Sequence, residues 1–189
     1  MTLTHFIRTY DHDLDASYCH DLIRRFEEDR EHHRAVVYPQ HRSFVELNLT
    51  SLSHWYDVHT YLIKKVEQAV VRYRQDVGLD DRQWPEQYGF EQIRIKRYLP
   101  GTDDEFRWHV DVGDYSSARR FLVCFWYLNT VQHGGETTFS VTSTTTPWYT
   151  SRAEQGKLLM FPPVWMFPHT GTKPISGPKY ILGTYLHYV

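Results

Sequence analysis

Cysteine is scarce in this chain. Cys19 and Cys124 are the only two among 189 residues, too few for the disulfide framework of a small secreted protein. Cys124 lies within the apolar run Phe121–Trp126, so we expect a buried, unreactive thiol. Long apolar stretches are missing as well. None approaches the roughly 20 residues that cross a bilayer, and we therefore expect no membrane association.

A strong excess of charge of either sign is also lacking. The formal net charge is −2, which offers no broad basic surface to nucleic acid or to an anionic membrane. The first residues, Met1 to His5, do not show the basic and then apolar pattern of a secretory signal. We expect a cytoplasmic protein that binds no nucleic acid. The sequence indicates no particular oligomeric state.

Aromatic residues, by contrast, are abundant at 16% of the chain, which suits a β-rich fold or an aromatic-lined pocket. The length fits a single domain, residues 1–189. Helical spacing of apolar residues begins near Leu14, and a longer apolar stripe runs from about Ser51 to Val77. Gly78 is the expected end of that second helix.

We predict that residues 1–89 form a helical N-terminal support, with a short edge strand at residues 3–10. Residues 31–50 give no clear pattern. From residue 90 onward, short strands alternate with turns rich in glycine and proline, which favours a sandwich or barrel. The expected fold is mainly β, with a core at residues 90–189 and the helices packed outside. Residues 142–155 are expected to form a polar loop.

His109 and Asp111 lie two residues apart in a predicted strand at residues 105–112. Side chains two apart on a strand point to the same face, so both can bind one metal ion. His169 would complete two histidines and one carboxylate, the facial triad of non-haem Fe(II) oxygenases. Alone, the His-x-Asp pair is a weak signal because it also arises by chance. The remaining histidines are interpreted as ordinary surface or core residues, among them His32, His33 and His54.

Lys179 opens the last predicted strand, after Ser176-Gly177-Pro178. A lysine at the mouth of an apolar strand usually extends its amine to solvent. Near a metal site it has a second possible role. Its ammonium can hold the far carboxylate of a diacid whose other end chelates the metal.

Five segments, in this order, resemble the prolyl 4-hydroxylase-like branch of the Fe(II)/2-oxoglutarate-dependent oxygenases. They are Arg97-Tyr98 with Pro100-Gly101, His109-Val110-Asp111, Trp126-Tyr127-Leu128-Asn129, Gly134-Gly135-Glu136-Thr137 with Phe139, and Phe161-Pro162 followed by His169 and Lys179. The match covers about residues 90–188. Residues 1–89 resemble no family.

The resemblance implies a double-stranded β-helix, or jelly-roll, with iron at its open end. It implies that His109, Asp111 and His169 bind Fe(II). It also implies that Lys179 pairs with the C5 carboxylate of 2-oxoglutarate, and that Tyr98 and Tyr127 add hydroxyls to that pocket. For both tyrosines a purely structural role stays open. The implied cofactors are Fe(II), 2-oxoglutarate and O2, with ascorbate as an optional addition.

The implied activity is hydroxylation of an unactivated C–H bond, with a prolyl residue in a peptide or protein as the expected substrate. A free amino acid or another small molecule is an alternative. A Zn-dependent hydrolase and a non-catalytic jelly-roll binding module are the others. Trp108 and Trp165, with Val110, are expected to keep the metal site dry, and the two tryptophans to line a groove for an extended chain. Trp148 is expected on an exposed loop. Gly183 falls where relatives carry a polar pocket residue.

Overall fold

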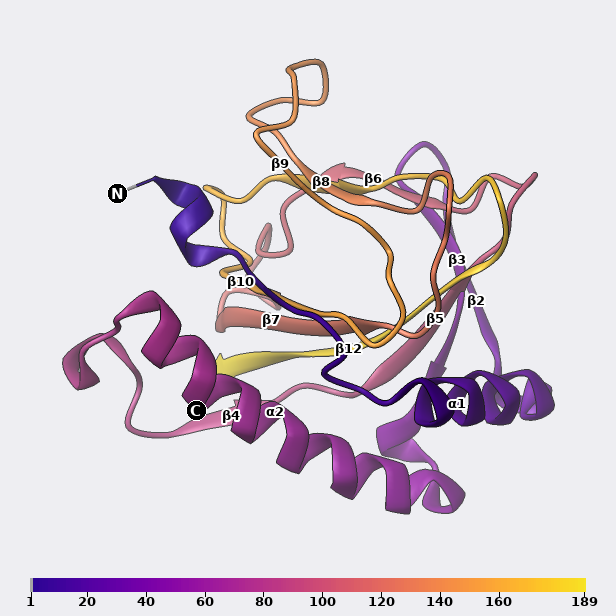
Figure 1. Cartoon of the computed structure of the whole chain (residues 1–189), viewed down its shortest axis with the longest axis horizontal. Helices are drawn as coiled ribbons and strands as arrows, with labels where there is room; N and C mark the ends of the chain where they lie inside the picture. The colour runs from indigo at the N-terminus through magenta and orange to yellow at the C-terminus, as the bar shows by residue number, and fades with distance from the viewer. Residues whose placement is uncertain (1) are drawn as a thin grey trace.

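The structure is a computed structural model that describes residues 2–189 (Figure 1). Its helices are α1 (Ala16–Glu28) and α2 (Tyr56–Val77), with 3-10 turns at Leu3–Phe6, Arg30–His32, Leu49–Ser51, Ser53–Trp55 and Asp81–Gln83. Its strands are β1 (Arg8–Tyr10), β2 (Arg34–Tyr38), β3 (Arg42–Asn48), β4 (Tyr88–Phe90), β5 (Arg94–Tyr98), β6 (Glu105–His109), β7 (Arg120–Tyr127), β8 (Thr137–Phe139), β9 (Tyr149–Ser151), β10 (Leu158–Phe161), β11 (His169–Gly171) and β12 (Lys179–Tyr188).

The strands of the described chain pair antiparallel into one sheet that curls back on itself. Its order is β1-β10-β7-β12-β5-β3-β6-β11-β8-β9, with β2 added beside β3 and β4 beside β12. The layer of β10, β7, β12 and β5 faces the layer that contains β6, β8 and β9 (Figure 1). Strand β3 pairs with both β5 and β6 and so joins the two layers at one side. The predicted jelly-roll architecture is confirmed.

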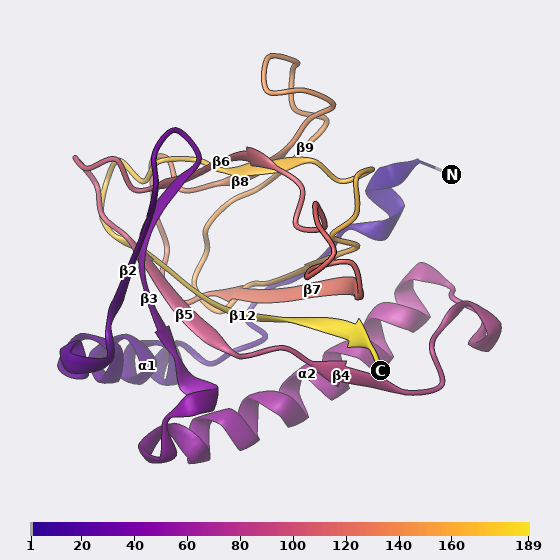
Figure 2. The same ribbon diagram turned by 180° about the vertical axis from the view of Figure 1, so that it is seen from behind.

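Both helices lie outside the layer formed by β7, β12 and β5 (Figures 1 and 2). The buried stripe of α2 packs on that layer, and it includes Val58, Leu62 and Val66. Each fully buried side chain of this size contributes roughly 1.5–3 kcal/mol. The helix ends as predicted at Gly78, whose left-handed φ of 72° suits glycine. No helix in the described chain is long and apolar enough to cross a membrane.

Alternation along β12 gives the sheet its two faces. The even-numbered residues from Tyr180 to Leu186 are buried, and the apolar ones among them pack toward the helices. The odd-numbered residues from Lys179 to Tyr185 line the interior of the roll. On β5 the same alternation turns Arg94, Lys96 and Tyr98 inward. The side of β5 that carries Arg94 and Lys96 therefore forms a charged wall of the interior. From the alternating pattern alone, this polar side of the strand would be expected to face solvent.

Residues 1–89 supply strands as well as helices. The hairpin β2–β3 occupies the stretch that gave no clear pattern, because β2 is exposed at four of its five positions and so shows no alternation. Only Arg8–Tyr10 of the predicted edge strand at residues 3–10 is a strand, and Leu3–Phe6 forms a 3-10 turn. The predicted loop at residues 142–155 contains β9, which pairs with β8.

Candidate active site

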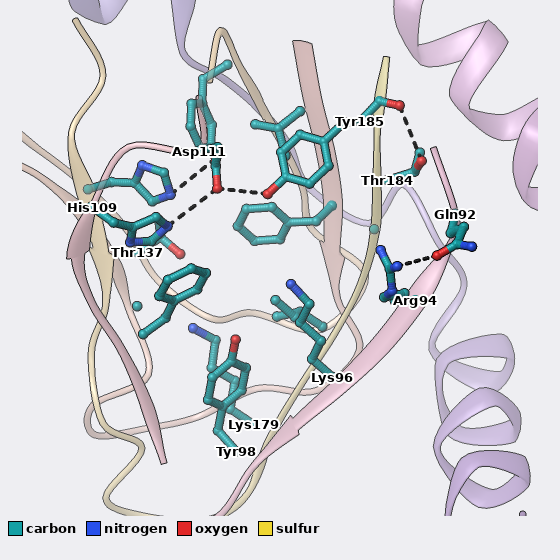
Figure 3. Close-up of a pocket in the computed structure, with 18 residues that line it drawn as sticks. Gln92, Arg94, Lys96, Tyr98, His109, Asp111, Thr137, Lys179, Thr184 and Tyr185 are labelled. Atoms are coloured by element: carbon teal, nitrogen blue, oxygen red, sulfur yellow. Dashed lines mark hydrogen bonds and ion pairs between the residues drawn. The ribbon is translucent and has the colours of Figure 1, made fainter. Parts of the chain in front are cut away.

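The three proposed metal ligands come together where β6 and β11 pair. His109 ends β6, Asp111 follows it, and His169 begins β11 directly opposite His109. The Nε2 atom of His109 lies 3.4 Å from Oδ1 of Asp111, and Nε2 of His169 lies 3.6 Å from its Oδ2. Their side chains are 7%, 5% and 8% exposed. His169 is distant in sequence from the other two, and the antiparallel register brings it beside His109. Figure 3 shows His109 and Asp111 side by side.

Backbone carbonyls orient both imidazoles. Nδ1 of His109 lies 2.6 Å from the carbonyl oxygen of Arg107, and Nδ1 of His169 lies 3.0 Å from that of Phe167. A carbonyl only accepts, so each Nδ1 carries the proton and donates it. Each Nε2 lone pair is then free to bind a metal ion. Nε2 of His109 is buried without a hydrogen-bond partner, as expected for a ligand atom.

The electrostatics favour the ionisation states that bind metal. Burial works to raise the pKa of the Asp111 carboxyl, but the imidazoles of His169 and His109 outweigh burial and hold that pKa far below its usual range. Burial, together with the neighbouring His109, lowers the pKa of His169 to about 4, against the opposing effect of Asp111. At neutral pH Asp111 is therefore charged and His169 neutral, the states in which carboxylates and imidazoles act as ligands.

This donor set fits a divalent metal ion. Ligand atoms about 2.1 Å from a metal and at right angles to each other lie roughly 3 Å apart. The spacings of 3.4 and 3.6 Å in the triad are close to that value and longer than an ordinary N–H···O hydrogen bond. Two imidazole nitrogens and one carboxylate are the ligand set of the non-haem Fe(II) facial triad.

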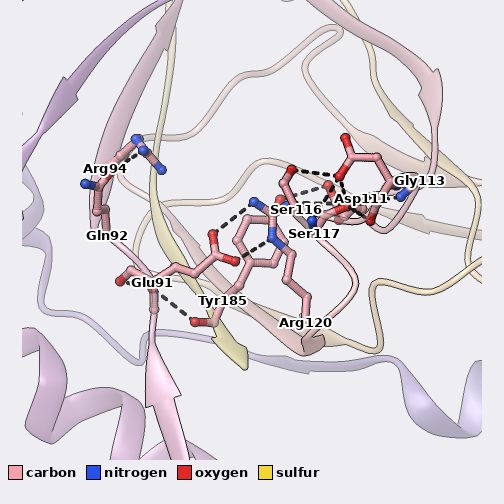
Figure 4. A network of polar contacts seen from close by, with 11 residues as sticks. Glu91, Gln92, Arg94, Asp111, Gly113, Ser116, Ser117, Arg120 and Tyr185 are labelled. Carbon is pink, nitrogen blue, oxygen red and sulfur yellow. Dashed lines mark hydrogen bonds and ion pairs between the residues drawn. The ribbon is translucent and has the colours of Figure 1, made fainter. Parts of the chain in front are cut away.

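Asp111 is held in place by residues that sequence reasoning missed. The hydroxyl of Tyr185 donates a 2.8 Å hydrogen bond to its Oδ1. Arg120 donates to the Asp111 carbonyl oxygen at 3.0 Å, and its guanidinium lies 4.1 Å above the ring of Tyr185. Glu91 holds Arg120 through two hydrogen bonds of 2.7 and 2.9 Å (Figure 4). This network fixes the carboxylate before any metal binds.

Phenylalanine rings, not tryptophans, enclose the imidazoles. Phe106 stacks on His109 with ring centroids 3.5 Å apart, and Phe161 contacts His169 edge-on at 4.9 Å. The prediction that Trp108 and Trp165 shield the metal site is wrong, because their side chains are 38% and 76% exposed. Trp108 adjoins His109 in β6, so the alternation that turns His109 inward turns Trp108 outward.

One further expectation about a single residue needs correction, and a second residue has a role in packing. Trp148 is partly buried and packs against Phe139 at 5.6 Å, so it is not loop-exposed as predicted. Gly183 lies where β7 approaches β12 closely. A Cβ at this position would sit 2.5 Å from Cβ of Phe125 and 2.7 Å from the carbonyl oxygen of Cys124. Glycine is thus required there by packing.

Lys179 reaches into the same cavity from the first residue of β12. It is 3% exposed, and its amine lies 5.5 Å from the ring of Tyr98 and 5.6 Å from that of Tyr127. Among the described residues it has no hydrogen bond and no carboxylate within 4 Å. Burial lowers the pKa of Lys179 to about 7, against the opposing effect of Glu136. A buried amine without a partner fits the carboxylate of a bound ligand.

The two predicted pocket tyrosines differ. Tyr98 pairs with Lys179 across β5 and β12 and lines the cavity. Tyr127 is fully buried, and its hydroxyl donates a 2.8 Å hydrogen bond to Thr137. Thr137 lines the cavity beside it. Tyr127 is thus placed to orient Thr137, while the ring of Tyr98 forms part of the wall.

A second, open cavity of about 490 Å³ adjoins the triad. It lies between the β2–β3 hairpin and the segment after Asp111, and His109 and Asp111 line it together with the first cavity. Arg94 and Lys96 also line both cavities. These two residues carried no signal in the sequence beyond the polar half of an alternating strand. His109 and Asp111 therefore lie where the two cavities meet.

Comparison with known proteins agrees with this geometry. The model of the 2OG-Fe(II) oxygenase superfamily matches residues 93–187. No curated protein sequence matches the chain.

Solved structures show a shared fold at low sequence identity. The viral collagen prolyl hydroxylase of Paramecium Bursaria Chlorella virus-1, in its 2OG complex, aligns with a TM-score of 0.71 at 19% identity over 97% of each chain. A Pseudomonas putida prolyl-4-hydroxylase aligns at 0.70 and 19%, over 98% of this chain and 94% of that one. A Trichoplax adhaerens prolyl hydroxylase in complex with a hypoxia inducible factor peptide aligns at 0.77 and 15%, over 97% and 84%.

Proposed function

Because the chain belongs to the 2OG-Fe(II) oxygenase superfamily, it is a dioxygenase that uses Fe(II), 2-oxoglutarate and O2, and we propose that it hydroxylates a prolyl residue in a peptide or protein. The observation that carries the proposal is the combination of His109, Asp111 and His169 with the buried amine of Lys179 in one cavity. A hydrolytic zinc site would need the triad but would leave Lys179 without a role.

In this proposal His109, Asp111 and His169 hold the iron. When bound, iron and 2-oxoglutarate supply the oxidising chemistry, which uses O2 to form succinate and CO2 and delivers one oxygen atom to the substrate. The protein prepares the ligands for this task. The carbonyl contacts of the two imidazoles keep each Nε2 free, and the hydrogen bond from Tyr185 fixes the rotation of the Asp111 carboxylate.

Lys179 is proposed to bind the C5 carboxylate of 2-oxoglutarate. An ammonium with little solvent around it attracts a carboxylate more strongly than one in water. Gly171 lies beside this amine, where a Cβ would make an ordinary contact of 3.6 Å with Nζ. Tyr98 and Thr137 are proposed as further walls of the 2-oxoglutarate pocket, with Tyr127 acting through Thr137.

A peptide substrate is supported by fold likeness and by the open cavity. Three structural neighbours are prolyl hydroxylases, and one of them was solved with a peptide bound. The open cavity runs from the triad under the β2–β3 hairpin, so an extended segment can reach the metal from outside. A free amino acid remains the alternative substrate, and ascorbate dependence stays a prediction.

The test combines two products. Purified protein with Fe(II), 2-oxoglutarate and air should form succinate, and proline-containing peptides should gain 16 Da at proline. Ascorbate is added and omitted in parallel. His109→Ala should abolish both products, whereas Trp165→Ala, at an exposed position, should leave succinate formation intact. Succinate without any peptide product would contradict the peptide proposal and leave the oxygenase assignment in place.

A further inference from the structure

Lys96 is a cation beside the metal site that the proposed chemistry does not use. It lies on β5 two residues before Tyr98, so both point into the roll. In Figure 3 its amine projects into the space between Tyr98 and Asp111. Lys96 also lines the open cavity. It therefore lies where the two cavities beside the metal ligands meet.

No carboxylate of the described residues lies within 4 Å of the amine of Lys96, although Glu46 stands opposite Lys96 in the pairing of β3 with β5. Among the residues that the structure describes, no hydrogen bond or carboxylate lies within reach of it, and it rests 5.0 Å from the ring of Phe44 and 6.0 Å from that of Phe106. Burial lowers the pKa of Lys96 to about 8, with Glu46 and Asp111 opposing the shift. Neither acid can neutralise Lys96 alone, since Asp111 is a proposed metal ligand and Glu46 lies 3.7 Å from Arg94.

The walls of the open cavity carry more positive than negative charge. Five arginine and lysine residues line it, against three acidic residues. Of the acids, Asp114 is occupied by hydrogen bonds from Ser116 and Ser117 in its own turn. Arg42, like Lys96, has no ion pair in the described chain, and its Nε is buried without a partner. A negatively charged group would satisfy both residues.

We propose that the substrate presents a carboxylate to Lys96, with Arg42 and Arg94 supporting it from the wall of the open cavity. The inference rests on the proposed oxygenase function and adds the substrate class. A single ammonium suits one carboxylate, with which it forms a charge-assisted hydrogen bond. The carboxylate comes from an Asp or Glu side chain beside the target residue in a peptide, or from the free carboxyl group of an amino acid. Lys179 remains the partner of 2-oxoglutarate.

The experiment uses matched probes. One set is a library of end-blocked peptides with a fixed central proline and varied neighbours, compared as Asp or Glu peptides against their Asn or Gln counterparts. The other set is L-proline against L-prolinamide. We expect wild-type protein to add 16 Da at least tenfold faster to the acidic member of one set. Product in the first set identifies a side-chain carboxylate, and product in the second a free carboxyl group.

Variants assign the effect to Lys96. Lys96→Met should remove the preference for the acidic probe, raising its KM at least tenfold, and Lys96→Arg should restore part of it. Lys173→Met is the control, because that lysine is exposed, pairs with Asp103 and lines neither cavity. Calorimetric titration of the acidic probe into anaerobic protein loaded with Fe(II) and 2-oxoglutarate gives the same comparison without turnover. The affinity for 2-oxoglutarate should not change in Lys96→Met.

Each other outcome counts against a defined claim. Equal rates for acidic and neutral probes, or an unchanged preference in Lys96→Met, overturn the carboxylate proposal. A raised requirement for 2-oxoglutarate in Lys96→Met also overturns it, because Lys96 would then serve the co-substrate. Succinate formation with no product from either probe set overturns it while the oxygenase function stands. No succinate from wild-type protein would defeat the proposed function itself.

Discussion

Within residues 2–189, which the structure describes, there are two clusters of two histidines and one aspartate, and only one of them has the geometry of a metal site. The second consists of Asp29, His32 and His54, on the surface beside α1. There Oδ1 of Asp29 lies 2.5 Å from Nδ1 of His32, and its Oδ2 lies 2.7 Å from Nε2 of His54. These are direct hydrogen bonds, too short to admit an ion between the atoms.

Burial and orientation separate the clusters further. His32 and His54 have side chains that are 36% and 51% exposed, and no backbone carbonyl fixes their rings. Asp29 already accepts a third hydrogen bond, from Nε1 of Trp55 at 2.7 Å. In the buried triad, by contrast, the Nδ1 atoms of His109 and His169 are hydrogen-bonded to backbone carbonyls. Their Nε2 atoms face the carboxylate of Asp111. Residue type is therefore a poor guide to metal binding, whereas unpaired ligand atoms at metal-like spacing are a good one.

The largest contrast should appear in iron affinity. His109→Ala or Asp111→Ala should weaken Fe(II) binding by more than roughly 100-fold, since even loss of a partner outside the ligand set costs 10- to 100-fold. Asp29→Ala should leave one strong site per chain. Anaerobic Fe(II) titration measures both. Comparable losses in the two clusters would contradict the distinction drawn between them.

Lys179→Met should weaken 2-oxoglutarate binding and spare iron. A charge-assisted contact in a sheltered pocket contributes about 1.5–3 kcal/mol, or roughly 10- to 150-fold. Lys173→Met, at a side chain that is 42% exposed, is the matched control. Titration of 2-oxoglutarate into the anaerobic Fe(II) protein is the measurement.

The pH profile checks the same contact. Because the pKa of Lys179 lies at about 7, the amine loses its proton as pH rises above that value. Affinity for the dianion should then fall by up to about tenfold per pH unit, and Lys179→Met should lose this dependence. A wild-type profile that stays flat from pH 6 to 9 would place the anchor elsewhere.

Tyr185→Phe should weaken iron binding less than loss of a ligand does. Its hydroxyl donates to Asp111 from outside the ligand set, where such partners are worth roughly 10- to 100-fold in metal affinity. Tyr180→Phe offers a control on the same strand, since that hydroxyl donates to Glu27 on the helix side. Equal Fe(II) affinities for the two variants would show that Asp111 needs no orientation by Tyr185.

The smallest effect on the enzyme is expected from Asp29, which should matter only for stability. Partial burial works to raise the pKa of Asp29, but hydrogen bonds from Trp55, His32 and His54 lower it to about 2. A depressed folded-state pKa stabilises the fold above the unfolded value near 4, and this contribution is lost as pH falls from about 4 to 2. Asp29→Ala should reduce the free energy of unfolding by about 1–3 kcal/mol at pH 7 and flatten its slope in that acid window, as measured by urea denaturation.

Local patterns decided much of this fold in advance. The apolar stripe that ends at Gly78 identified α2, and the short strands after residue 90 indicated the jelly-roll. The spacing of His109 and Asp111 predicted that both side chains turn to one side, because alternation is a property of the extended backbone. They do meet, although β6 ends at His109 and Asp111 follows the strand. The same rule would have turned Trp108 away from the metal, and applying it would have avoided that error.

Tertiary structure decided which face of each strand is enclosed and which distant residues meet there. The alternation of side chains along β5 predicts that Arg94 and Lys96 share a face with Tyr98. Only the packing of the hairpin β2–β3 makes that face the wall of a cavity. Asp111 is held by Tyr185 of β12 and Arg120 of β7. These two strands are remote in sequence and pair with each other in the sheet. A sequence pattern fixes the period of side chains along one element. It does not record which other element packs on them, and here that packing turns an alternating strand into part of an active site.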